Sequence, residues 1–255
     1  MAASGDKPLL KQLRGFLKDS IRKQVDFAKT DQSRGVLPPA LEKPCAVDQK
    51  IIDLVGPEEW PGIPPFDLKT AITNRRSRRA FLRQPLSLEE LSFLLWATQG
   101  VVRRGKGYAL RTVPSAGARH ALETYICALS VESLERGVYR YLPVEHALAL
   151  EFADEELALK LVPATFGQSF AGHASAVFVW AAIPYRMEWR YGDASHKVIA
   201  LDAGHVCQNL YLACEAISSG TCAIAAYDQE EIDSLLRLDG EDEFVVYLAP
   251  VGKVR

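Results

Sequence analysis

The longest apolar pattern in the chain runs from Asp193 to Gly220 and predicts one long helix. Its apolar side chains fall on nearly every face of that helix: Val198, Ile199, Leu201, Val206, Leu210, Leu212, Ala213 and Ile217. A helix that is apolar all round is buried in a large core or in a subunit interface. Asp193 or Ser195 can cap its start, and Gly220 suits the left-handed residue that ends helices. We therefore expect a central helix of roughly 35–40 Å, around which the rest of the chain packs.

Other apolar patterns predict a sheet flanked by helices. Residues 174–183 form an apolar run that only Ser175 interrupts, which is typical of a buried central strand. Alternating patterns predict further strands at 122–130, 137–143, 147–152 and 243–252, and helical spacing predicts helices over 7–28, 68–74, 86–99, 154–162 and 229–236. Because strands and helices do not alternate strictly, the pattern favours an α+β fold over a doubly wound parallel sheet.

Residues 30–70 interrupt these patterns. Seven of the 14 prolines lie between Pro38 and Pro65, and proline disfavours regular elements. We expect an irregular connector on the surface, so that residues 1–69 form an N-terminal helix and proline-rich arm, and residues 70–255 form the main domain. Residues 101–113, which are basic and contain glycine, are expected to form a loop.

Composition and charge restrict the binding partners and the cellular compartment that we expect. The net charge of −2 gives no global reason to bind nucleic acid or a membrane, and no apolar run reaches the ~20 residues that span a bilayer. The start of the sequence lacks the apolar core of a signal peptide. The cysteines are odd in number and form no CxxC pair, which favours core positions in a reducing cytoplasm: Cys45, Cys127, Cys207, Cys214 and Cys222.

Four arginines surround Ser77: Arg75, Arg76, Arg78 and Arg79. Guanidinium groups this close repel one another unless an anion or carboxylates neutralise them, and their forked donors match phosphate oxygens. The alternative is a solvated basic face at the end of a helix. Nucleic acid is disfavoured because no aromatic residues are interleaved with the arginines.

Two small-residue segments could admit a flat ligand to the backbone. In Pro114–Gly117 the proline fixes φ, and Ala116 and Gly117 leave space. The segment 220–226 is similarly small. Each has a structural alternative, a simple turn for the first and close packing for the second.

Asp202, His205 and Asn209 share one face of the predicted central helix. A metal site would require more histidine or carboxylate ligands, so a satisfied buried network is the better interpretation, and we expect no metal. Nucleotide-binding loops of the GxGxxG and GxxxxGK[ST] types are absent from the sequence.

Taken together and in order, several motifs resemble the FMN-dependent nitroreductase superfamily, and most closely its SagB-type dehydrogenase branch, which includes azoline oxidases of ribosomal peptide biosynthesis. The motifs run from about Thr70 to Gly252: RRSRRAF, LSLEELSFLLWATQG, RTVPSAGARH, VYRYLP, LDAGHVCQNLYLAC and the closing PVG. The resemblance implies an α+β sandwich that forms an intertwined homodimer with FMN at the subunit interface.

The resemblance also implies which residues bind the cofactor. The phosphate and ring edge would be contacted by Arg75, Arg76, Ser77 and Arg79, together with a basic residue near the C-terminus, Lys253 or Arg255. The other subunit would approach the flavin through Pro114, Ser115, Ala116 and Gly117. The ring face near N5 would be covered by Thr221, Cys222, Ala223 and Ile224. Gln208 and Asn209 would support the site or the dimer.

Two positions depart from the relatives' patterns. Ala118 stands where typical nitroreductases have an asparagine that contacts the flavin, as in the SagB-type branch. Arg190-Tyr191 stands where azoline oxidases have a Lys-Tyr pair thought to remove the substrate proton. Arginine stays protonated and is a poor general base, whereas Tyr191 can donate or relay a proton. These two residues are the catalytic candidates.

The function implied is an FMN-dependent oxidoreductase. Hydride would pass from NAD(P)H or another donor to N5 of FMN and then to a small organic substrate in a ping-pong cycle. One alternative is a thiazoline or oxazoline dehydrogenase that acts on modified peptides. Another is a flavin-binding protein without redox turnover, and a third takes residues 103–111 as a nucleic-acid surface.

Overall fold

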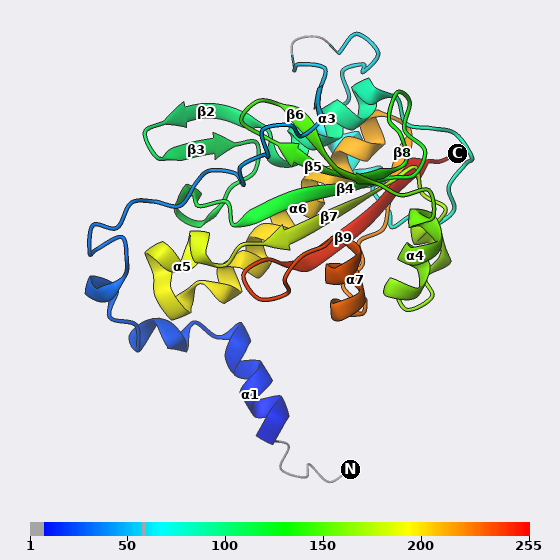
Figure 1. Ribbon diagram of the computed structural model, residues 1–255. Coiled ribbons are helices and arrows are strands. Elements are labelled where there is room, and N and C mark those ends of the chain that lie inside the picture. The colour runs from blue at the N-terminus through cyan, green and yellow to red at the C-terminus, as the bar shows by residue number, and fades with distance from the viewer. Residues whose placement is uncertain (1–7, 58–59) are drawn as a thin grey trace, which may run out of the picture.

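A seven-stranded sheet forms the centre of the molecule in the computed structural model, which describes residues 8–57 and 60–255 (Figure 1). The strand order is β1-β6-β5-β4-β7-β9-β8, and each neighbouring pair is antiparallel. The strands are β1 (Ile51–Asp53), β4 (Leu122–Ala128), β5 (Gly137–Leu142), β6 (Ala147–Ala153), β7 (Ala176–Ala182), β8 (Ser219–Thr221) and β9 (Phe244–Lys253). The predicted α+β class with a mainly antiparallel sheet is confirmed.

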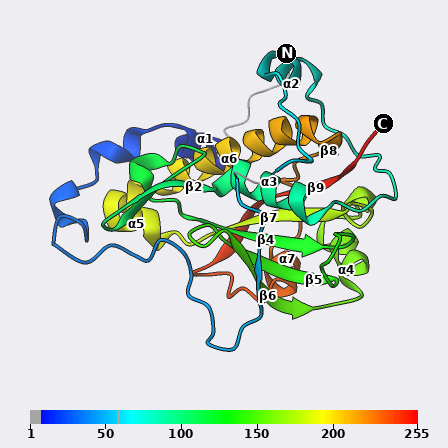
Figure 2. The same cartoon turned by 90° about the horizontal axis from the view of Figure 1, so that it is seen from above.

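Helices cover both faces of this sheet (Figure 2). One face packs against α3 (Leu88–Gln99) and α6 (His196–Ala216), and the other against α4 (Leu157–Ala164) and α7 (Gln229–Leu235). In β7, Phe178 and Trp180 belong to the first core and Val177 and Val179 to the second. Because successive side chains of a strand point to opposite faces, the unbroken apolar sequence of β7 fits a strand that is covered on both sides, as predicted.

Helix α6 differs from its prediction at both ends. Ser195 precedes it, but its hydroxyl makes no capping hydrogen bond. At the other end Ser218 takes the left-handed conformation with φ 50°, whereas Gly220 lies in β8. The 21 residues give a length of about 32 Å. The helix is not buried all round either, because one stripe is exposed: Ala200, Leu201, Gly204, His205 and Gln208.

The arm is less helical than predicted and contributes to the sheet. The helix expected over 7–28 is α1 (Pro8–Leu17) followed by two short 3-10 turns at Ser20–Lys23 and Phe27–Lys29, and residue 7 lies outside the described residues. Figure 1 shows α1 extending away from the body. Further along, β1 pairs with β6 at the edge of the sheet. The domain boundary at 69/70 stays a prediction.

Residues 101–113 are not a loop. They form a two-stranded hairpin of β2 (Val101–Gly105) and β3 (Tyr108–Arg111). Gly107 lies in its turn with φ +75°, a conformation that favours glycine. The basic residues Arg103 and Arg104 obscure the alternation that would have indicated a strand. Two short helices, α2 (Leu68–Asn74) and α5 (Tyr185–Tyr191), complete the architecture, and only α2 was predicted. Within the described ranges, no helix has both the length and the apolar character needed to cross a membrane.

Candidate functional site

The arginine segment lies against the loop that follows α6. Ser77 forms an isolated parallel bridge with Thr221, and the Arg78 amide donates to the Thr221 carbonyl at 2.9 Å. The segment 75–79 is therefore extended, and its successive side chains point in different directions. Two groups of predicted cofactor ligands that are far apart in the sequence are brought together here.

Tyr211 of α6 joins these two segments. Its hydroxyl oxygen lies 3.0 Å from Ser77 Oγ and accepts the Ala223 amide at 2.8 Å. The Arg75 guanidinium lies over the Tyr211 ring, 5.3 Å from its centroid. The sequence analysis missed Tyr211. A usable signal was its position three residues after Gln208, which places the two side chains on neighbouring parts of one helix face. We call Arg75, Arg76, Ser77, Tyr211 and the loop 221–224 the arginine half-site.

This half-site has uncompensated positive charge. Among the described residues, no carboxylate lies within 4 Å of Arg75, Arg76 or Arg79, whereas Arg78 faces Glu215 at 3.9 Å. Arg76 donates to the Asn74 carbonyl at 2.8 Å and is exposed. The Arg79 guanidinium lies over Phe170 instead, 5.8 Å from the ring centroid, so it is not brought beside Tyr211. Arg75 and Arg76 can therefore still bind an anion with charge-assisted hydrogen bonds.

Lys253 and Arg255, the predicted C-terminal phosphate ligands, differ in their surroundings from Arg75 and Arg76. Lys253 is ion-paired with Glu90, and it also donates to the Ile217 carbonyl at 2.9 Å. Its charge is already compensated in this chain. Arg255 is exposed and lines a cavity of about 500 Å³ together with Arg78.

A second group of predicted residues meets near the start of α6. Gly117 has φ +59°, and a Cβ placed on it would lie 2.7 Å from Tyr191 Oη and 2.8 Å from Arg190 Nε. Real Cβ atoms do not approach neighbours this closely, so only glycine fits at this position. The segment Pro114–Gly117 is thereby placed against the two catalytic candidates. We call Ser115–Ala118, Arg190, Tyr191 and Asp202 the serine half-site.

Asp202 is the buried acid of this second group. Its side chain is 6% exposed, and within the described structure its Oδ2 has no hydrogen-bond partner. Burial raises the pKa of Asp202, while Ser115 and the Ala116 amide oppose that shift. The buried network predicted around it is wrong, because His205 is exposed and Asn209 donates to the Ala97 carbonyl at 2.8 Å. Asp202 is left with one oxygen that can accept a hydrogen bond.

The other predicted cofactor ligands lie on α6 and in the loop 221–224. Gln208 is exposed in the stripe along α6, and Thr221 donates its hydroxyl to the Pro250 carbonyl at 2.9 Å. Cys222 and Ile224 are buried at the start of the loop. Of the cysteines, only Cys45 is exposed, so the expectation of core positions holds for the other four.

The two half-sites lie toward opposite ends of α6. Asp202 and Tyr211 are nine residues apart, which corresponds to about 13–14 Å along the helix axis. Figure 1 shows α5 near the start of α6 and β8 near its end. One chain therefore presents two separate groups of candidate ligands.

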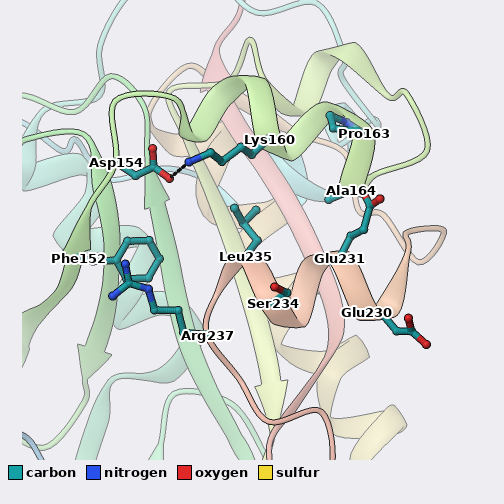
Figure 3. Close-up of a pocket in the computed structure, with 10 residues that line it drawn as sticks. All are labelled: Phe152, Asp154, Lys160, Pro163, Ala164, Glu230, Glu231, Ser234, Leu235 and Arg237. Atoms are coloured by element: carbon teal, nitrogen blue, oxygen red, sulfur yellow. Dashed lines mark hydrogen bonds and ion pairs between the residues drawn. The ribbon is translucent and has the colours of Figure 1, made fainter.

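One further cavity belongs to neither group. It encloses about 640 Å³ between β6, α4 and α7, and Figure 3 shows Arg237 beside Phe152 and Lys160 bonded to Asp154. The Arg237 guanidinium is 3.8 Å from the Phe152 ring centroid. Because none of the predicted site residues lines it, we do not assign the chemistry to this cavity.

Comparisons with known proteins agree with this architecture. The Nitroreductase family matches residues 72–253. A nitroreductase-type protein of Methanocaldococcus jannaschii, MJ1384, is 36% identical over 195 residues, which cover 76% of this chain and 95% of that protein. The trifolitoxin-processing protein TfxB of Rhizobium leguminosarum bv. trifolii is 30% identical over 170 residues, or 63% of this chain and 46% of TfxB. This chain thus spans about half the length of TfxB.

Solved structures show the same fold. A nitroreductase-type protein from Ralstonia eutropha superposes with a TM-score of 0.67 at 27% identity, covering 86% of this chain and 97% of the other. A chain of the Escherichia coli microcin synthetase McbBCD complex superposes with a TM-score of 0.61 over 98% of this chain and 95% of that one, and at 19% identity it shows the fold alone. The resemblance found in the motifs is confirmed, and TfxB supports its SagB-type branch. The chain belongs to the nitroreductase family.

Proposed function

We propose that this protein is an FMN-dependent oxidoreductase that works as a homodimer. One observation carries the proposal: the arginine half-site is a cluster of donors, Arg75, Arg76 and Ser77, without a carboxylate within 4 Å in the described chain. Such a cluster suits a phosphate group. The small side chains of the loop beside it suit a flat ring. These residues fit FMN.

Each residue has a role that its contacts support. Arg75 and Arg76 would hold the phosphate, and Ser77 would donate a hydroxyl proton to it. Loop 221–224, held by the bond from the Ala223 amide to Tyr211, would cover the ring. When bound, FMN supplies the hydride chemistry, which side chains cannot perform alone. NAD(P)H is the proposed donor and a small organic molecule the acceptor.

A homodimer would bring the two half-sites together. The exposed stripe on α6 is centred on Gly204, whose Cβ position has no atom within 4 Å. Its neighbour Leu201 is 52% exposed. If two α6 helices pack antiparallel near residues 206–207, Tyr211 of one copy lies level with Asp202 of the other. Each cofactor would then be bound by the arginine half-site of one subunit and the serine half-site of its partner.

The absorbance spectrum of the purified protein tests this proposal. We expect a yellow dimer that binds about one FMN per chain and loses its flavin absorbance on anaerobic titration with NADH or NADPH. A colourless monomer that ignores added FMN would exclude the proposed function. A different result would support a flavin-binding protein without turnover. In that case NADH and NADPH would not reduce the bound FMN, and an added acceptor would not reoxidise FMN that dithionite has reduced.

Dehydrogenation of azolines in modified peptides is the second candidate. The similarity to TfxB and the position of Tyr191 against the Gly117 backbone favour it. Arg190 cannot act as the base because its guanidinium stays protonated, so Tyr191 would have to relay the proton. We expect a thiazoline-containing peptide to be oxidised by the wild type and not by Tyr191→Phe. A wild type that leaves the thiazoline intact would exclude this alternative.

A further inference from the structure

We propose that Arg119 and Arg190 form a clamp for an anionic group of the substrate, so that the preferred substrates are small organic anions such as aromatic carboxylates. This inference rests on the proposed function and names its substrate class. Arg190 belongs to the serine half-site, and Arg119 follows directly after its loop, Ser115–Ala118.

Arg119 is held in a fixed orientation. Its guanidinium lies over the Trp189 ring, 5.0 Å from the centroid, and donates to the Gly107 carbonyl at 3.0 Å. Its Nε is buried and has no hydrogen-bond partner among the described residues. Stacking on an aromatic ring fixes the plane of an arginine without using its in-plane donors. The Arg119 fork is therefore positioned and still has donor capacity.

Arg190 approaches the same loop from α5. Its guanidinium lies over the Tyr191 ring, 5.5 Å from the centroid, and its Nε is 2.8 Å from the Cβ position of Gly117. Within the described structure it makes no side-chain hydrogen bond and no ion pair. Arg119 stacks on Trp189, the residue that precedes Arg190 in the chain, so the two arginines approach this region from the two sides of α5 and the loop after Gly117.

Among the described residues, neither Arg119 nor Arg190 has an ion-pair partner. Burial and the charge of Arg190 both lower the pKa of Arg119. The closest acid on α5, Glu188, is bonded to His196 at 3.0 Å. Two half-buried cations side by side are unfavourable unless an anion joins them. Because carboxylates pair with two forked donors in this way, a ligand carboxylate would relieve the repulsion.

The phosphate of FMN already has a separate set of donors. Arg75, Arg76 and Ser77 lie at the other end of α6, and the clamp lies beside the catalytic candidate Tyr191. An arginine at position 190 is then suited to orient a charged substrate, since it cannot accept a proton. We therefore assign the clamp to an anionic group of the substrate.

Matched substrates provide the test. The FMN-loaded protein would be assayed with 4-nitrobenzoate and with its neutral methyl ester, in the wild type and in Arg119→Gln and Arg190→Gln. We expect either variant to raise KM for the acid about 10- to 100-fold more than KM for the ester, the loss typical of a charge-assisted hydrogen bond. Arg237→Gln is the control, because Arg237 also stacks on an aromatic ring but lies beside α7.

Binding without turnover gives an independent result. Calorimetry should show that benzoate binds the FMN-loaded wild type more tightly than either clamp variant, even if neither nitro compound is reduced. The affinities for FMN and for riboflavin, which lacks the phosphate, should be unchanged in both variants. A selective loss of FMN affinity would assign the clamp to the cofactor phosphate and overturn the inference.

The remaining outcomes separate the two proposals. A wild type that binds FMN but does not distinguish acid from ester and does not bind benzoate would refute the clamp and leave the proposed function standing. A wild type that binds no FMN would refute the proposed function first.

Discussion

The hydroxyl groups of Ser77 and Tyr211 lie 3.0 Å apart, although the two residues are 134 positions apart in the sequence. The Ala223 amide can only donate, so the Tyr211 oxygen is the acceptor of that bond at 2.8 Å. The two hydroxyls share one further hydrogen bond and therefore leave one hydroxyl proton free. Either Ser77 or Tyr211 can offer this proton to a bound anion, beside the unpaired guanidinium of Arg75.

Tyr211→Phe should weaken FMN binding by about 3- to 30-fold, because the Ala223 amide loses its acceptor and Ser77 loses its partner. Riboflavin should be affected less if this hydroxyl pair acts at the phosphate. Flavin fluorescence titration measures both affinities. Tyr139→Phe is the control. It too removes a bonded tyrosine hydroxyl, which here donates to the Glu135 carbonyl at 2.8 Å. Additive effects of Ser77→Ala and Tyr211→Phe in a double-mutant cycle would argue against a hydroxyl pair that acts as a unit.

Arg75→Ala and Arg76→Ala should each reduce FMN affinity by about tenfold or more, because each loses a charge-assisted contact with the phosphate. Arg79→Ala should have a smaller effect, since Arg79 lies over Phe170. The sequence motif alone treats Arg76 and Arg79 alike. Flavin content after purification and titration at two salt concentrations would distinguish them. Equal losses in Arg76→Ala and Arg79→Ala would contradict the arrangement described here.

Gly117→Ala should lower the stability by about 1–3 kcal/mol, since alanine is strained at φ +59° and its Cβ would displace Tyr191 and Arg190. Turnover should fall as well, because both catalytic candidates lose their positions. Urea unfolding and steady-state kinetics provide the measurements. Gly35→Ala is the control: φ is +79° there, but nothing lies within 4 Å of its Cβ position. Similar losses of turnover in both variants would show that contact at Gly117 is unimportant.

Leu201→Asp should convert the dimer into monomers, because a charge would be buried in the proposed α6 interface. FMN affinity should fall with it as the half-sites separate. Leu159→Asp is a matched control on α4, where the leucine is 75% exposed. Sedimentation and flavin titration would show both effects. A Leu201→Asp protein that stays dimeric and yellow would place the interface elsewhere.

Glu42 should make a contribution to stability that falls as the pH rises from about 5 to 8. Burial and the neighbouring Glu145 raise the pKa of Glu42 to about 7, so over this range the folded protein keeps a proton that the unfolded chain releases. The expected loss is on the order of 1–3 kcal/mol, measured by urea unfolding at fixed protein concentration. Glu42→Gln should remove most of this dependence, and the exposed Glu241→Gln should not. A pH dependence that is unchanged in Glu42→Gln would rule out this carboxyl.

Local patterns were sufficient for much of the architecture. Ser87 and Glu90 form the reciprocal capping box expected at the start of α3, with bonds of 3.1 and 3.0 Å. The run at 174–183 specified a strand covered on both faces because all of its positions except Ser175 are apolar. Capping and side-chain periodicity depend on residues a few positions apart, so the sequence displays them directly. The family motifs likewise identified the nitroreductase fold.

Other features required contacts that no local pattern contains. The hairpin at 101–111 carries charges where alternation would have revealed it. Helix α6 ends at Ala216, and Ser218 takes the left-handed conformation where the chain turns into β8. The link from Ser77 through Tyr211 to Ala223 and the contact of Gly117 with Arg190 join residues that are distant in the chain. The sequence by itself determined the fold class and the types of residue available for binding. Only the tertiary structure decided which guanidiniums stay unpaired and which hydroxyls meet, because both depend on neighbours brought together by the packing of the sheet against α6.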